Sequence, residues 1–275
     1  MITPAAARTR RRRSRWLALL PVSADPLSWL VSLEGVSSAY AATRDGIDVM
    51  LRDRGLRRTS PEMTGESLLR GAHASAVLEG SASTLAEVRA SGGDPIAQDA
   101  VRLSAELLGL VPVLQRTPLQ APARLHALAA AASGGASGGA SSGAAGGASE
   151  LGRPRSAEAA ARLRGLADLL TVRTAAPALV VAAIVHADLA TAAPFASHNG
   201  IVARAAERLV LVARGVDEKS LVVPEAGHLA LRPQYESNLR GYASGSQAGV
   251  HAWLLYGAEA FAAGAEASPL RRDAV

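Results

Sequence analysis

The chain has no cysteine, a single lysine (Lys219) and few aromatic residues, which make up 3% of its 275 residues. The lack of cysteine excludes disulfides, thiolate metal sites and a cysteine nucleophile. Because 49% of the residues are hydrophobic and so few are aromatic, the core must consist mainly of Ala, Leu and Val. These small side chains suit closely packed helices, and Ala, Leu, Arg and Glu all favour helix formation. Strict apolar alternation over the length of a strand is also lacking, so the sequence predicts an all-α fold.

Long apolar runs are missing too. No stretch approaches the ~20 apolar residues that span a bilayer, so we expect no transmembrane segment. Residues 8–15 hold six arginines and no acid, and without them the formal net charge falls from +5 to about −1. Residues 8–24 superficially resemble a twin-arginine signal, but Pro21, Asp25 and Pro26 interrupt the apolar part. We therefore expect a cytoplasmic protein.

The basic N-terminus is set apart from the remaining chain by its composition. Residues 1–25 are expected to form a disordered arm, either a solvated tail or a segment that binds nucleic acid or anionic lipid non-specifically. Residues 133–149 contain only Gly, Ser and Ala, which is typical of a flexible segment that does not pack. We interpret this stretch as a disordered insertion in one helical domain that spans residues 26–275.

Helix caps and apolar periodicity indicate where the helices of this domain begin. Ser60-Pro61 and Asp94-Pro95 are N-cap and N1 pairs, and Ser156 is a third cap. The predicted helices cover residues 38–54, 61–79, 95–114, 119–131, 157–170, 176–189 and 203–214, with two more in 235–261.

The most informative segment, APFASHNGIVAR, occupies residues 193–204 between two of these helices. The first turn of a helix has unpaired N–H groups and the positive end of the helix dipole, which together favour an anion such as phosphate. Arg204 is expected on the first turn of the second helix, where its guanidinium would add further donors.

This segment resembles the signature loop of the Fic (Fido) family, HPFx(D/E)GNGRxxR. Five positions match: Pro194, Phe195, Asn199, Gly200 and Arg204. The resemblance implies a Fic-like helical bundle and, from the family's chemistry, transfer of AMP from ATP to a hydroxyl group. It also implies that Phe195, Asn199, Gly200 and Arg204 are the nucleotide-binding residues.

A second segment, SAVLEG at residues 75–80, resembles the family's inhibitory motif (S/T)xxxE(G/N). The resemblance gives Ser75, Glu79 and Gly80 a regulatory role and pairs Glu79 with Arg204. GRPR at 152–155 resembles the G-x-x-R that precedes the family's target-binding flap, and residues 235–261 resemble its closing helices. The likeness extends over roughly residues 40–264.

Four positions that carry chemistry in the family differ here. The general base is replaced by Ala193, the metal-binding acid by Ser197, the first glycine by His198 and the first arginine by Ile201. Loss of a general base typically costs ~10²–10⁴-fold in rate. His198 either obstructs the phosphate site or serves as a relocated base. The few residues after Arg155 also leave no room for a hairpin, so the flap is predicted to be shortened or absent.

The resemblance and these differences together predict a Fic-fold protein that is catalytically inactive, without a catalytic residue. It would act as a partner-binding or weak nucleotide-sensing module, with a protein partner that the sequence does not identify. The alternative is a divergent Fic-type nucleotidyltransferase that transfers AMP to a protein hydroxyl. ATP or another nucleotide is a conceivable ligand, whereas Ser197 makes Mg²⁺ binding doubtful.

The remaining histidines show no spacing typical of a metal site, such as HExxH. We therefore expect each of them to be a hydrogen-bonded polar residue, and we predict no metal site. These histidines are His73, His126, His186, His228 and His251.

Overall fold

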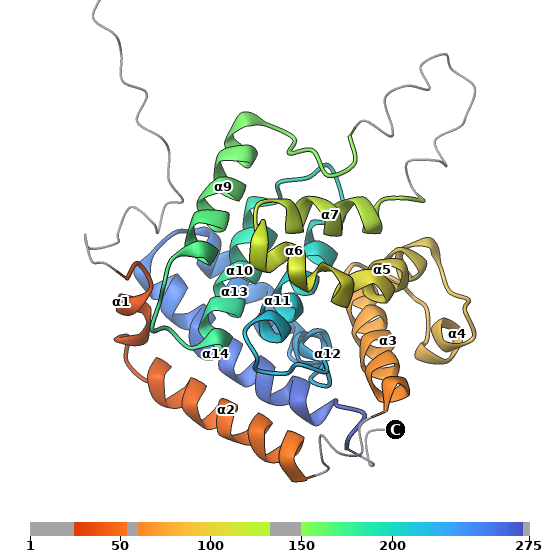
Figure 1. The fold of residues 1–275 in the computed structure, drawn as a ribbon, viewed down its shortest axis with the longest axis horizontal. Coiled ribbons are helices and arrows are strands. Elements are labelled where there is room, and N and C mark those ends of the chain that lie inside the picture. Colours follow the sequence, from red (N-terminus) through yellow and green to blue (C-terminus); the bar gives the residue numbers. More distant parts are fainter. Residues whose placement is uncertain (1–24, 54–59, 133–149, 272–275) are drawn as a thin grey trace, which may run out of the picture.

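A computed structural model describes residues 25–53, 60–132 and 150–271, and within these ranges the chain is helical with no strand. The predicted arm falls almost wholly on residues 1–24, and the predicted insertion on 133–149, both outside the described residues. Figure 1 shows the arrangement of the helices. They are α1 (Ser28–Val31), α2 (Val36–Asp53), α3 (Pro61–Leu78), α4 (Leu85–Arg89), α5 (Pro95–Glu106), the 3₁₀ helix η2 (Leu107–Leu110), α6 (Val111–Arg116), α7 (Gln120–Ala129), α9 (Ala157–Thr171), α10 (Ala178–Ala192), α11 (Asn199–Ala213), α12 (Pro224–Ala230), α13 (Arg232–Ala243) and α14 (Gln247–Glu266).

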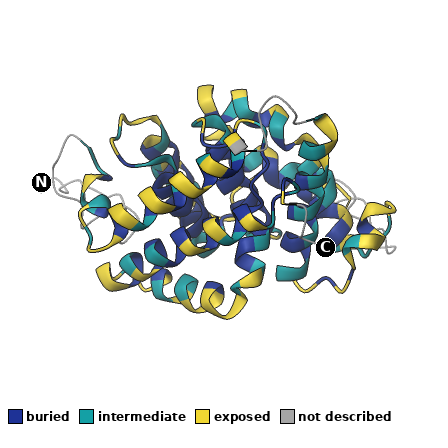
Figure 2. Ribbon diagram, turned by 90° about the horizontal axis from the view of Figure 1, so that it is seen from below, coloured by how far each residue is buried: buried dark blue, intermediate teal, exposed yellow. Residues whose placement is uncertain are grey.

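Helix α10 lies at the centre of the bundle. Every residue from Leu179 to Leu189 is buried, which is expected for a helix that is apolar on all sides. It contacts α2, α9, α11, α13 and α14, so helices from both ends of the described chain cover it. The buried residues form a continuous interior in Figure 2, and the exposed ones lie on the outer helix faces. None of the described helices is both long and apolar enough to cross a membrane.

The predicted caps are mostly confirmed. The side chain of Asp94 accepts a hydrogen bond from the N–H of Ala97 at 2.9 Å, and Ser156 accepts one from Ala159 at 3.1 Å. Each bond satisfies a donor that the first helical turn leaves unpaired. Ser60 is also the residue before its helix, but its side chain makes no capping hydrogen bond.

Three expectations need correction. The helix predicted over 95–114 is broken into α5, η2 and α6, because Pro112 in the first turn of α6 has no N–H to continue the ladder. Helix α11 begins at Asn199 rather than at 203, so Arg204 is its sixth residue and does not lie on the first turn. The short helices α1, α4 and α12 were not predicted.

The expectation of a missing flap agrees with the structure. Helix α9 begins at Ala157, directly after the cap Ser156, and leaves no length of chain for a hairpin after Arg155. The backbone N–H of Arg155 instead bonds to the carbonyl of Pro194 at 2.9 Å. The segment that would lead into a flap is therefore fixed to the loop between α10 and α11.

Candidate functional site

The α10–α11 loop is a tight connection bounded by two residues with left-handed backbone. Ala193 ends α10 with φ 41° and ψ 61°, and His198 precedes α11 with φ 57° and ψ 17°. This region is costly for any residue that has a Cβ. Asn199 braces the turn, because its side chain accepts from the N–H of Phe195 at 2.9 Å and donates to the carbonyl of Phe195 at 3.0 Å.

Phe195 turns inward from this loop. Its ring is 1% exposed and stacks on His126 with ring centres 4.4 Å apart. The other side of this contact is also fixed, since Nδ1 of His126 accepts from the N–H of Gly152 at 2.9 Å. The aromatic ring of Phe195 and the amide of Asn199 thus hold the loop in shape.

Arg204 projects from α11 into the interior and is 1% exposed. Its Nε donates to Oγ of Ser75 at 2.8 Å, and Nη1 donates to the hydroxyl of Tyr235 at 3.1 Å. Nη2 donates both to the carbonyl of Ser75 at 3.1 Å and to Oε1 of Glu79 at 2.7 Å. The structure thus brings together the two residues that the family resemblance pairs, and it adds Ser75 and Tyr235 as partners of the guanidinium.

Glu79 also lies against the beginning of α11. A Cβ at position 200 would collide with its carboxylate oxygen, so Gly200 is required for this close approach. A carboxylate near the first turn is stabilised by the helix dipole. The next residue, Gly80, has φ 96° and ends α3, which turns the chain away after Glu79. Glu79 therefore occupies the place where α11 would favour an anion.

The substituted positions of the loop face in different directions. Ile201 is 2% exposed and packs in the hydrophobic core, so this position offers no donor to the loop. Ala193 has only a methyl group where the family has a base. Ser197 is exposed, and its Oγ lies 2.7 Å from Nδ1 of His198, whose Nε2 lies 3.0 Å from Oδ2 of Asp99 on α5.

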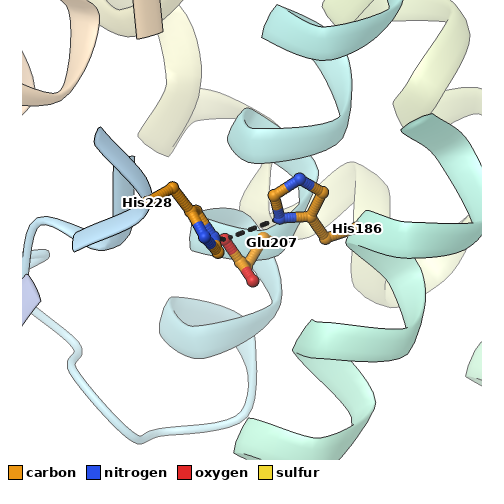
Figure 3. Close-up of side chains that lie close together, drawn as sticks. All are labelled: His186, Glu207 and His228. Atoms are coloured by element: carbon orange, nitrogen blue, oxygen red, sulfur yellow. Dashed lines mark hydrogen bonds and ion pairs between the residues drawn. The ribbon is translucent and has the colours of Figure 1, made fainter. Parts of the chain in front are cut away.

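A second polar cluster lies inside the bundle. His186 on α10, Glu207 on α11 and His228 on α12 are each at most 1% exposed, and Figure 3 shows both rings directed at the Glu207 carboxylate. Oε2 of Glu207 is 3.0 Å from Nδ1 of His186 and 2.8 Å from Nε2 of His228. The far nitrogens reach tyrosine hydroxyls, Nε2 of His186 that of Tyr235 at 3.0 Å and Nδ1 of His228 that of Tyr256 at 2.7 Å.

Burial sets the charges in this core cluster. It lowers the pKa of His186 to about 4, which keeps the ring neutral near pH 7. Burial alone would raise the pKa of Glu207, but its interactions with His186 and His228 outweigh that effect and lower the pKa to about 2. The cluster therefore consists of an ionised carboxylate held by two imidazole rings, and Tyr235 connects it to Arg204.

The core cluster also has a donor set that zinc accepts in proteins, since its two nitrogens and one oxygen lie within 4.8 Å of one another. Both rings, however, approach the same carboxylate oxygen at hydrogen-bond lengths. Nε2 of His228 is hydrogen-bonded to this oxygen, whereas Nδ1 of His186 is buried without a hydrogen-bond partner. Sequence reasoning missed the cluster because its members lie 21 residues apart on three different helices.

Comparison of the sequence with protein-family models and with curated proteins finds no match. Among solved structures, the chain is similar to the crystal structure of a Fic family protein from Desulfovibrio desulfuricans G20. The TM-score is 0.62 at 18% sequence identity, over 83% of this chain and 73% of that chain. At this identity the likeness concerns the fold alone, and on that basis the chain has a Fic-like, all-α fold.

Proposed function

We propose that this chain is a Fic-fold protein that is inactive in AMP transfer, a single domain over residues 26–275, which acts by binding a protein partner. The observation that carries the proposal is the engagement of Arg204, which is buried and bonded to Ser75, Glu79 and Tyr235. A guanidinium has five N–H donors in a fixed plane, and four contacts to protein groups already use most of them. Arg204 therefore serves the fold rather than a bound phosphate.

The chemistry of the loop supports the loss of AMP transfer. AMP transfer requires a base at the acceptor hydroxyl, donors for the developing charge and a device that positions the acceptor. Ala193 supplies no base, buried Ile201 supplies no donor, and the chain after Arg155 enters α9 without a flap. The residues of the loop fit Mg²⁺ poorly, because the metal-binding acid of the family is a serine at position 197.

One observation favours nucleotide sensing as a second function. Of the two charged partners, Arg204 has a side chain that is 2% exposed, whereas that of Glu79 is 34% exposed. Glu79 could therefore leave its ion pair with Arg204, here called the clasp, while Arg204 stays in place. ATP or another nucleotide would then bind by displacing Glu79 from Gly200 and Arg204, with Phe195 and Asn199 shaping the loop. Ser75, Glu79 and Gly80 would be the regulatory segment.

Transfer of labelled AMP tests the inactive state. Full-length protein is incubated with [α-³²P]ATP, Mg²⁺ and a lysate, and we expect no covalent label above a heat-killed control. Ala193→His should also fail, because Ile201 and the missing flap still remove a donor and the acceptor site. Label that depends on the intact protein would instead support the alternative, a divergent nucleotidyltransferase.

Calorimetric titration separates the two binding functions. If the chain only binds a partner, neither the wild type nor Glu79→Ala binds ATP in the millimolar range. If it senses nucleotides, Glu79→Ala binds ATP at least tenfold more tightly than the wild type does. Glu236→Ala, which removes an exposed carboxylate on α13, is the matched control and should leave binding unchanged.

A further inference from the structure

The α10–α11 loop holds a hydroxyl, an imidazole and a carboxylate in series. Oγ of Ser197 lies 2.7 Å from Nδ1 of His198, and Nε2 of the same ring lies 3.0 Å from Oδ2 of Asp99. The exposure falls along the series, since Ser197 is exposed and the side chains of His198 and Asp99 are 14% and 6% exposed. We propose that Ser197 is a nucleophile activated by His198 and Asp99, and that it accepts acyl groups from neutral carboxylic esters.

The hydrogen bonds define which nitrogen of His198 acts as the base. The carboxylate of Asp99 can only accept, so Nε2 of His198 carries the proton and donates it. Nδ1 then has a free lone pair, and the hydroxyl of Ser197 donates to it. Arg102 binds the other carboxylate oxygen of Asp99 at 2.7 Å and helps to fix its orientation. A base oriented by a third group is the general arrangement that activates a serine.

A helix-capping role does not explain His198. It precedes α11, yet its side chain makes no capping hydrogen bond, and the ring contacts Ser197 and Asp99 instead. Its left-handed backbone, φ 57°, is unfavourable for a residue with a Cβ and occurs preferentially at functional sites. The other histidines in the described ranges bond to backbone groups or to buried side chains, whereas His198 bonds to an exposed hydroxyl.

The charges near the loop favour a neutral electrophile. Glu79 already occupies the anion-favouring start of α11 against Gly200 and is paired there with Arg204, so a phosphate would have to displace it. A neutral ester needs no anion site and leaves this pair in place. The proposal therefore does not rest on the proposed function, since it needs neither a nucleotide nor release of the clasp.

The reaction balances with water as the co-substrate. Oγ of Ser197 forms a bond to the acyl carbon while its proton passes to Nδ1 of His198. The tetrahedral adduct then breaks its bond to the alcohol oxygen, which takes the proton from His198 and leaves as alcohol. Water adds to the acyl-serine ester in the same way, releases the carboxylic acid and restores Ser197.

The test uses a fluorophosphonate probe on the full-length protein. The probe forms an O–P bond with an activated serine and loses fluoride, and peptide mass spectrometry locates the label. We expect one equivalent of label on Ser197, none there in Ser197→Ala, and a rate at least 100-fold lower in His198→Gln. Ser244→Ala and His251→Gln are matched controls, because Ser244 is an exposed serine and His251 bonds to a backbone carbonyl. Both should label like the wild type.

The Asp99→Asn variant shows whether Asp99 orients His198 or only supports the fold. If Asp99 orients His198, labelling slows at least tenfold and its midpoint in pH shifts, while the circular-dichroism spectrum stays unchanged. The burst of p-nitrophenolate from p-nitrophenyl acetate should show the same order of variants. Absence of label on Ser197 of the folded wild type, or equal labelling of Ser197 and Ser244, would overturn the proposal. Because Ser197 is exposed, its alanine variant folds and the comparison can always be made.

Discussion

Two clusters of this fold combine imidazole with a carboxylate. The core cluster combines His186, Glu207 and His228, and the loop cluster combines Ser197 with His198 and Asp99. In the first, both rings are buried, and their hydrogen bonds join helices of the interior: His228 is bonded at both nitrogens and His186 at Nε2. In the second, one ring joins a buried carboxylate to an exposed hydroxyl. Position relative to solvent, rather than residue type, decides whether imidazole and carboxylate stabilise the fold or can meet a substrate.

The largest effect should follow from Glu207→Gln. The amide removes the negative charge that both rings approach, and it leaves buried polar groups without suitable partners. Removing one member of a buried charged network costs about 4 kcal/mol. Urea denaturation should show this loss in the free energy of unfolding. Glu259→Gln, an exposed change on α14, is the control. A similar loss of unfolding free energy in both variants would show that the core cluster does not stabilise the fold.

A slightly smaller effect is expected for the clasp. Arg204→Ala should lower the free energy of unfolding by about 3 kcal/mol, since it leaves Glu79 and Tyr235 without their donor. Glu79→Ala should cost less because this side chain is partly exposed, and the double variant should lose less than the sum. The exposed pair Arg232–Glu236 is the control cycle, with a coupling below about 0.5 kcal/mol. Additive losses at Glu79 and Arg204 would argue against a clasp.

Acid should weaken the core cluster. The pKa of His186 in the folded state, about 4, is below its ordinary value of 6.5, so the unfolded chain binds the extra proton first. The contribution to stability is complete above pH 6.5 and declines as the pH falls toward 4, by about 2 kcal/mol between pH 7 and pH 5. Melting temperatures across this range should show the decline for the wild type and for His251→Gln. His186→Gln should flatten it, and an unchanged slope in that variant would contradict the assignment.

The smallest effect concerns the loop backbone. Ala193→Gly should stabilise the protein by about 1 kcal/mol, because φ 41° is unfavourable for alanine and accessible to glycine. Ala196→Gly in the same loop should be neutral or slightly destabilising, since its backbone is not left-handed. Thermal melting of both variants measures the difference. A destabilised Ala193→Gly would mean that the strain at the end of α10 is absent.

Local signals predicted much of the fold. The helix starts after Asp94 and Ser156 followed from capping chemistry, and the α10–α11 turn followed from Pro194 and Asn199. Arg204 and Glu79 came from the family resemblance, and the structure brings them into contact. The connection from His198 to Asp99 could not be predicted, because 99 residues separate them and only the packing of α5 beside the loop joins them. The core cluster could not be predicted for the same reason, since its residues lie 21 positions apart on three helices and only the packing of those helices brings them together.

The burial of α10 on all sides has a consequence for the order of folding. Its apolar surface is covered in part by α14, whose Trp253 donates a hydrogen bond to the carbonyl of Ala183 and whose residues are synthesised some 55 to 88 positions later. Until α14 arrives, α10 presents an uncovered apolar helix, the kind of surface that makes a nascent chain prone to aggregate. Chaperone capture on the ribosome should therefore peak after α10 has emerged and end when α14 has docked.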